Sequence, residues 1–275
     1  MNLDVAFGQY YEGNSLIHRL DPRFKLLIAI VMIVAVFMAR NVYSFALLFI
    51  VTLVFIAVSK VPLGIIVRGM KSLIFILIFT AAINIFWLKG ETLLFEWKFI
   101  HIYLEGIINA ALIFARIVIL IALTGVILTY TTTPLGLTDG LERLLSPLAK
   151  LRVPVHEFSM MMTIALRFIP TLVEETQKIM NAQTARGATF SEGGLIKRAK
   201  ALIPIIIPLF VSSIRRATEL ADAMECRCYV GGEGRTKMNV LHAGAKDVAA
   251  LFAAAAVLAG VILIDRYAPG YTLGL

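Results

Sequence analysis

The stretch ECRCY, residues 225–229, holds both cysteines of the chain, one on each side of Arg227. Thiols at this spacing suit a redox couple, half of a metal site, or two small neighbours of a functional arginine. On a helix, Cys226 and Cys228 would point about 200° apart, which excludes an ordinary disulfide. A metal site needs three or four ligands, and the nearest histidine, His242, lies 14 residues beyond Cys228. We therefore expect no disulfide and no metal.

The composition is that of an integral membrane protein. Hydrophobic residues make up 59% of the 275 residues and charged residues 16%, with a mean hydropathy of +0.86. Soluble domains contain about 45–50% apolar residues. The net charge of +8 does not indicate nucleic acid as a partner, because basic residues of membrane proteins gather in cytoplasmic segments. The first 24 residues carry several charges and no apolar run, so they are not a signal peptide.

Five apolar runs are long enough to cross the hydrocarbon, which takes roughly 17–25 helical residues. The predicted spans are residues 20–38, 42–58, 72–88, 106–130 and 248–264. Asp21 is the expected N-cap of the first, with Pro22 at its first helical position. The predicted fold is thus an all-α integral membrane protein with about five transmembrane helices. Its predicted domains are residues 1–130 with four spans, 131–246 as a helical coupling domain, and 247–275 with the last span and tail.

The distribution of lysine and arginine predicts the orientation. Fifteen of these residues lie between positions 131 and 246, whereas Arg40, Lys89, Lys98 and Arg266 flank the opposite ends of the spans. Basic residues concentrate on the cytoplasmic side. We therefore expect the N-terminus and residues 131–246 in the cytoplasm and the C-terminus outside the cell membrane.

Residues 131–246 are predicted to form helices rather than a nucleotide-binding or hydrolase fold, since no Gly-rich phosphate loop or nucleophile motif occurs there. We predict helices over Leu137 to about Leu151, Val155–Ala185, and Leu195 to about Cys228. The last two are amphipathic and carry charges, which favours the cytoplasm or the membrane interface. The alternative is two further membrane spans. Candidate hinges are Pro170, Pro204, Pro208 and the Gly193–Gly194 link, which packing could equally hold as fixed kinks or caps.

Two arginines end these long helices in similar surroundings. The stretch NAQTARGATF (181–190) aligns with DAMECRCYVG (222–231) when Arg186 is placed on Arg227. Small residues flank both arginines: Ala185 and Gly187 in one case, Cys226 and Cys228 in the other. Small neighbours let a partner surface close around a guanidinium and pair with it bidentately. The alternative is that both arginines neutralise a helix C-terminus, with Gly187 as a left-handed cap.

With these features the chain resembles the transmembrane T component of energy-coupling factor transporters, the EcfT/CbiQ-like family. The resemblance covers nearly the whole chain, including HRLDPRFKLL (18–27), four spans, a helical coupling segment and a last span. The family's Ala-Arg-Gly motif is matched outright at residues 185–187. At residues 226–228 only the arginine is kept.

The resemblance implies a non-catalytic subunit, without a cofactor, of an ABC-type vitamin importer. Two cytoplasmic ATPases would bind the ends of the two long crossed helices, and a small substrate-binding membrane subunit would lie on their apolar faces. The expected ATPase-coupling residues are Ala185, Arg186, Gly187, Cys226, Arg227 and Cys228. The expected contact surface for the substrate-binding subunit is Phe158, Met161, Met162, Phe168 and Leu172. The methionines suit an adaptable surface, and equally an ordinary core.

Three other functions are considered. A dedicated T component of a cobalt or nickel importer would have the same architecture. A self-sufficient secondary transporter or channel would need several ionisable groups at mid-membrane, where only Arg116 stands; Asn84 lies in another span, and neither is assigned a transport role. A membrane enzyme would need a nucleophile with a base or a metal constellation, and the predicted cytoplasmic segment has neither.

Overall fold

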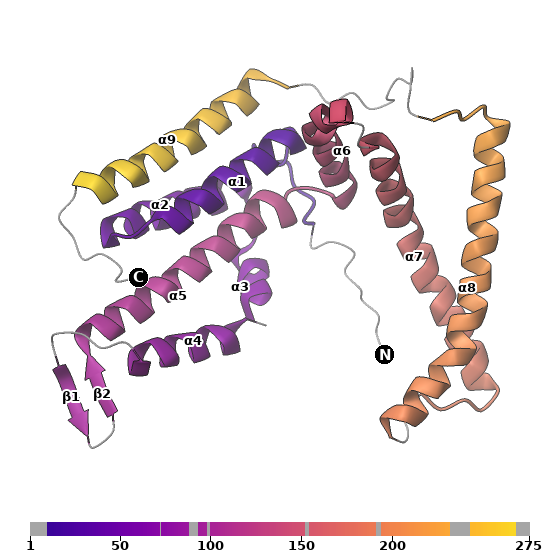
Figure 1. The fold of residues 1–275 in the computed structure, drawn as a ribbon, viewed down its shortest axis with the longest axis horizontal. Coiled ribbons are helices and arrows are strands. Elements are labelled where there is room, and N and C mark those ends of the chain that lie inside the picture. The colour runs from indigo at the N-terminus through magenta and orange to yellow at the C-terminus, as the bar shows by residue number, and fades with distance from the viewer. Residues whose placement is uncertain are drawn as a thin grey trace. The chain divides into compact units, whose positions relative to one another are not determined.

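The computed structural model describes residues 10–71, 73–87, 93–97, 100–151, 154–190, 194–231 and 243–267. The chain divides into two compact units, one formed by Met1–Arg143 with Leu241–Leu275 and the other by Leu144–Val240. Figure 1 shows that both are built almost entirely from helices. The all-α class predicted from the sequence is confirmed.

Most helices of the first unit are strongly apolar, and they form its membrane part. A π-helical turn, Gly125–Thr129, prolongs one of them, α5. The helices of this unit are α1 (Pro22–Met38), α2 (Val42–Ser59), α3 (Leu63–Lys71), α4 (Ile74–Trp87), α5 (Leu104–Thr124), α6 (Pro134–Leu145, whose last two residues belong to the second unit) and α9 (Ala245–Tyr267).

Of the five predicted spans, those over residues 42–58, 106–130 and 248–264 correspond to helices of spanning length, whereas the first is a helix of 17 residues. The helix over residues 195–226, which was predicted to belong to the coupling domain, is also of spanning length. Among the described residues, α2, α5 with its π-helical turn, α8 (Leu195–Cys226) and α9 are long and apolar enough to cross a membrane. The first predicted span begins at Pro22, and the Asp21 carboxylate caps it by accepting a hydrogen bond from the Arg23 amide at 2.9 Å. The third differs: α4 has only 14 residues, about 21 Å of helix. Together with α3, which is inclined to it by 65°, it forms a bent fifth candidate.

A short antiparallel hairpin precedes α5, which the sequence analysis did not predict. Its strands are β1 (Leu93–Trp97) and β2 (Ile100–Tyr103), paired from Trp97 with Ile100 to Leu93 with Tyr103. Strong β-formers make up most of β2 and include Phe95 and Trp97 of β1, which is the signal that could have revealed the hairpin.

The core of the first unit surrounds α1. Met32, Ala35 and Val36 of α1 are fully buried, and α1 packs mainly against α9, with further contacts to α5. Leu48 of α2 and Val261 of α9 are also fully buried in the same cluster. Figure 1 shows these four helices side by side, in accordance with their contacts. Small side chains on α1 allow this close approach, as in many membrane helices.

A buried lysine ties three segments together at one end of this bundle. The Lys25 side chain is only 1% exposed, and its Nζ donates to the Thr131 carbonyl at 2.8 Å, to Thr132 Oγ1 at 3.1 Å and to the His18 carbonyl at 3.3 Å. Nearby, Asp247 of α9 accepts a hydrogen bond from the amide at the cap of α1, 2.9 Å away. These contacts fix the start of α1 to the end of the α5 segment and to α9.

A second polar cluster lies at the other end of α1. Asp265 of α9 accepts hydrogen bonds from the amides of Arg40 (3.0 Å) and Asn41 (3.1 Å) and from the Ser44 hydroxyl, and so caps α2. Arg116 of α5 donates to the Ala39 carbonyl at 2.6 Å. The carbonyl at the C-cap of α1 thus has its donor, and Arg116 has a structural partner.

The other intramembrane polar residue also bonds to backbone: Asn84 Nδ2 donates to the Thr80 carbonyl one turn earlier, at 2.9 Å. This bond remains within α4. Like Arg116, Asn84 therefore has a local structural explanation.

The second unit consists of a 3₁₀ turn (Ser146–Leu151) and two long helices, α7 (Val155–Ala185) and α8. The predicted bounds of α7 are confirmed, and α8 ends two residues earlier than predicted. The helix expected from Leu137 to about Leu151 is instead α6 followed by the 3₁₀ turn. Pro170 lies inside α7, and Pro204 and Pro208 lie inside α8, without interrupting either helix. Of the predicted Gly193–Gly194 link, Gly194 is the N-cap of α8, and its neighbour lies outside the described residues.

Replacing Lys25 tests the cluster at the start of α1. Lys25→Met keeps the length of the side chain but leaves buried acceptors without a donor, which costs about 1–3 kcal/mol per lost partner. Unfolding in mixed micelles of increasing denaturing detergent should show this loss of stability. Lys71→Met, at an exposed position, is the control and should leave the midpoint unchanged. Equal midpoints for the two variants would contradict a structural role for Lys25.

Candidate functional site

The C-terminus of α7 closes in a backbone turn centred on Arg186. Arg186 is the C-cap residue, and Gly187 follows it with φ of 87°. The Gly187 amide donates to the Thr184 carbonyl at 2.9 Å, and the next amide donates to the Gln183 carbonyl at 3.0 Å. This is the Schellman arrangement, in which a left-handed residue lets the backbone satisfy the last carbonyls of the helix.

The C-terminus of α8 closes in the same way around Arg227. Arg227 is the C-cap residue, and Cys228 follows it with φ of 56°. The Cys228 amide donates to the Glu225 carbonyl at 2.8 Å, and the Tyr229 amide donates to the Met224 carbonyl at 3.0 Å. Each bond reproduces one at the end of α7. Cys228 therefore occupies the position of Gly187, a left-handed position that glycine adopts more easily.

These two turns explain the cysteines. Cys228 is the left-handed residue of a helix cap, and Cys226 is the last residue of α8. Both are free and exposed, and the described part of the chain contains no group of residues that could hold a metal ion. Like Ala185 and Gly187, Cys226 and Cys228 are small residues that flank an arginine.

Both arginines are available to a partner. Arg186 and Arg227 are exposed, together with their immediate neighbours. Within the described ranges, neither guanidinium has a hydrogen bond or an ion pair, because the backbone amides already satisfy the helix ends. The left-handed cap expected at Gly187 is confirmed. The cap does not use the arginine side chain, whose charge still favours the helix C-terminus.

The structure does not bring the two arginines together. Figure 1 shows the C-terminal ends of α7 and α8 at opposite ends of the helix pair. They are thus two separate candidate docking points rather than one composite site.

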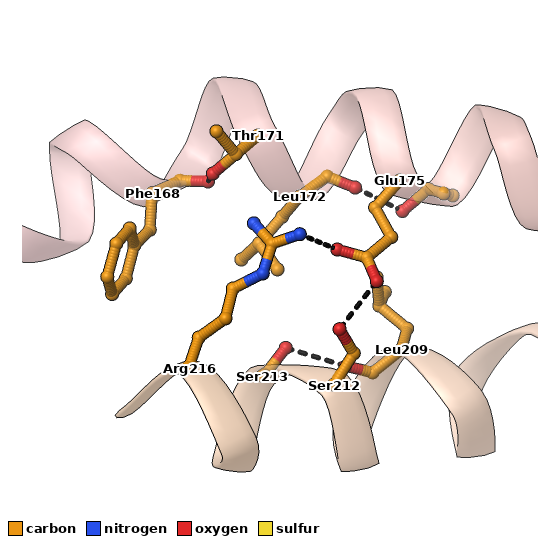
Figure 2. Close-up of polar contacts among 9 residues, drawn as sticks. Phe168, Thr171, Leu172, Glu175, Leu209, Ser212, Ser213 and Arg216 are labelled. Atoms are coloured by element: carbon orange, nitrogen blue, oxygen red, sulfur yellow. Dashed lines mark hydrogen bonds and ion pairs between the residues drawn. The ribbon is translucent and has the colours of Figure 1, made fainter. Parts of the chain in front are cut away.

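The five residues expected to contact a substrate-binding subunit fall into two groups. Phe158, Met161 and Met162 are exposed, with Phe158 at 50% and Met161 at 57%. Phe168 and Leu172 are half-buried, and Figure 2 shows their side chains on the side of α7 that faces α8. The first group forms a free apolar surface, whereas the second also contributes to the crossing of the helices. The assignment of all five as a contact surface remains a prediction.

The sequence analysis missed a polar contact between the long helices. Arg216 of α8 forms an ion pair with Glu175 of α7, and the Ser212 hydroxyl donates to the other oxygen of the same carboxylate at 2.5 Å (Figure 2). The sequence did contain a signal for the ion pair, since Glu175 and Arg216 are separated by the same 41 positions as Arg186 and Arg227.

Comparison with known proteins gives the family of the chain. The family model described as CbiQ, cobalt transport protein, matches residues 13–238. A protein of Ruminiclostridium cellulolyticum is 47% identical over 262 residues, covering 95% of this chain and 97% of its own. Relatives from Clostridium kluyveri (49% over 264 residues, 96% and 97% covered) and Bacillus subtilis (46% over 247 residues, 90% and 93% covered) are similar. All three are named energy-coupling factor transporter transmembrane protein EcfT.

The apolar helices and the family match define the class, a multi-span membrane component of a transporter. More particularly, the chain belongs to the CbiQ family, that of the transmembrane T components of energy-coupling factor transporters. Membership implies a transporter complex with further subunits.

Exchanging the residues at the two left-handed positions tests the caps. Cys228→Gly removes the cost of a side chain at positive φ, about 1 kcal/mol, and should slow amide exchange at the end of α8 about fivefold. Gly187→Ala introduces that cost and should speed exchange at the end of α7 by a similar factor. Hydrogen exchange read by mass spectrometry measures both, with each helix serving as the control for the other. Unchanged exchange in both variants would show that the caps do not hold the helix ends.

Proposed function

We propose that the chain is the non-catalytic scaffold subunit of an energy-coupling factor ABC-type importer. It couples ATP hydrolysis by two cytoplasmic ATPase subunits to the movement of a small substrate-binding membrane subunit during vitamin uptake. The ATPases bind at residues 185–187 and 226–228. The substrate-binding subunit contacts the apolar surface of α7 around Phe158, Met161 and Met162.

The observation that carries this proposal is the pair of equivalent helix ends. Each end offers one exposed guanidinium with no partner in the described part of the chain, between two small residues. A guanidinium pairs bidentately with a carboxylate, and small neighbours let a groove close around it. Two such ends, alike in backbone conformation, suit two copies of a similar acidic groove.

An exposed apolar surface on α8 also supports contact with a substrate-binding membrane subunit. Its first half is exposed at Leu202, Ile203, Ile206, Ile207 and Phe210. Exposed apolar surface of this extent marks contact with lipid or with a membrane partner. Charged residues flank this apolar stretch on both sides, at Lys197, Arg198 and Lys200 and from Arg215 onward, so both ends of the helix favour water at the membrane interface.

The orientation follows from the same charges. The N-terminus and residues 131–246 lie in the cytoplasm, and the C-terminus lies outside. The lysines and arginines of residues 131–246 support this arrangement through the positive-inside rule.

A dedicated cobalt or nickel importer is the second candidate function. The observation that favours it is the description of the matching family, which is cobalt transport protein. The relatives at 46–49% identity are instead named for the energy-coupling factor transporter. The small membrane subunit recovered with this chain distinguishes the two, because its pocket would present metal ligands in one case and not in the other.

Charge reversal at the caps tests the ATPase contacts. Arg186→Glu and Arg227→Glu each replace attraction by repulsion at a desolvated charge pair, a loss of about 2–5 kcal/mol. Pull-down of the tagged chain from native membranes should therefore recover at least tenfold less ATPase with either variant. The small membrane subunit should be recovered as with the native chain.

Arg198→Glu, an exposed arginine near the start of α8, is the matched control and should recover the full complement. Full ATPase recovery with both cap variants would contradict the proposal.

The two native cysteines test the orientation, because both are exposed and lie within the segment assigned to the cytoplasm. A membrane-impermeant maleimide should label them in inside-out vesicles and leave them unlabelled in right-side-out vesicles. A variant with both cysteines changed to serine and Tyr267→Cys, at the exposed end of α9, should show the opposite pattern. Labelling of Cys226 and Cys228 from the outside would reverse the assigned topology.

A further inference from the structure

The second halves of α7 and α8 repeat one another with a shift of 41 positions, the separation of the residues in the crossing ion pair. The caps have the same backbone hydrogen bonds after this shift. The half-buried positions also coincide, at spacings of three and four that define one helix face. The coinciding pairs are Phe168 with Leu209, Leu172 with Ser213, Glu175 with Arg216, Ile179 with Leu220, and Gln183 with Met224.

The charges near the centre of this repeat are reversed. Glu174 and Glu175 of α7 correspond to Arg215 and Arg216 of α8, and Lys178 corresponds to Glu219. At the two ends the sign is instead the same, since Arg186 corresponds to Arg227. Within the second halves, the reversed stretch includes Glu175 and Arg216, the two residues that meet at the crossing; Glu157 and Arg198 of the first halves are also opposite in sign at this shift.

A two-fold crossing explains the reversal. When two equivalent elements cross about a two-fold axis, a residue on the axis faces its own equivalent. Two glutamates or two arginines there would repel one another, whereas a glutamate facing an arginine attracts. If the position on the axis is charged in both helices, opposite charges are therefore favoured there.

The observed contact joins equivalent residues. Glu175 and Arg216 form the ion pair at the crossing, and Ser212, the equivalent of Thr171, donates to the same carboxylate (Figure 2). The axis of the repeat therefore passes close to this pair. Arg186 follows Glu175 by 11 residues, and Arg227 follows Arg216 by 11. Both arms from the crossing to a cap arginine thus have three helical turns, about 16 Å.

The described part of the second unit has a small buried core. Among the described residues of this unit only Val155, Ser159 and Ile205 are buried. The side chains of Glu175 and Arg216 are 20% and 37% exposed, so this pair is among the better shielded polar contacts of the unit. An interface with so small a core depends on its few directional contacts for its geometry.

We propose that Glu175 and Arg216 are a positioning pair on a pseudo-two-fold axis, which sets the separation of Arg186 and Arg227 and so matches them to two equivalent grooves. This inference rests on the proposed function for the identity of the grooves. The crossing itself does not require the partner.

Distance measurement between the arms tests the pair in the isolated full chain. Spin labels are placed at the equivalent positions 185 and 226, using Ala185→Cys and the native Cys226, with Cys228→Gly to leave one label on α8. The native pair should give one narrow distance distribution. Glu175→Gln and Arg216→Gln should each broaden it at least twofold. The reciprocal exchange, Glu175→Arg with Arg216→Glu, should restore the native width.

The matched controls are Glu174→Gln and Arg215→Gln, the adjacent exposed residues of the same charge, which should leave the width unchanged. Native widths in the Glu175→Gln and Arg216→Gln variants would overturn the proposal. So would an exchange variant as broad as the single variants, because misfolding would then explain the broadening.

Dissociation of the ATPases tests the positioning role with unlabelled chains. A fixed spacing lets both ends engage together, which raises the effective concentration of the second contact. The ATPases should leave the Glu175→Gln and Arg216→Gln chains at least fivefold faster than the native chain, and the exchange variant should return to the native rate. Unchanged rates beside broadened distances would overturn the positioning role. Failure of the native chain to bind any ATPase would instead overturn the proposed function, and the distance measurement would still decide the crossing.

Discussion

The last carbonyls of an α-helix need donors, and how α7 and α8 supply them determines what their ends can do. In both helices the backbone reverses through a left-handed residue and donates its own amides. The arginine side chains at the caps are released from that task and remain exposed. A cap built on side chains would have occupied the same groups that a partner needs. Because the backbone amides cap both helices, the guanidinium groups of Arg186 and Arg227 are left free for a partner.

The two units are stabilised by different kinds of contact. The membrane unit buries an apolar cluster around α1 and fastens each end of that helix, with Lys25 at one end and Arg116 at the other. Polar contacts of this kind are costly to break where water is scarce. In its described part, the α7–α8 unit has few buried residues and one partly shielded ion pair. The first unit thus depends on buried apolar packing, and the second on its few directional contacts.

Sequence alone predicted the elements better than their contacts. Amphipathic periodicity and charge predicted α7 and α8, and Gly187 indicated the cap at the end of α7. The left-handed conformation of Cys228 was not foreseen, because cysteine does not indicate positive φ. The Glu175–Arg216 pair was missed because an alignment of ends does not say where two helices touch. The same shift of 41 positions would have pointed to it, had charge reversal been sought within the repeat.

The reversed charges also restrict which helices can associate when many copies share a membrane. Two α7 helices from different chains would set Glu175 against Glu175, and two α8 helices would set Arg216 against Arg216. A slip of one turn along α8 would bring Glu175 to Glu219, again with like charges. Mispairing is thereby penalised in each case, and the intended crossing is favoured by comparison as well as by its own attraction. A repeat with identical charges in both halves would lack this discrimination between its partner helix and its own copies.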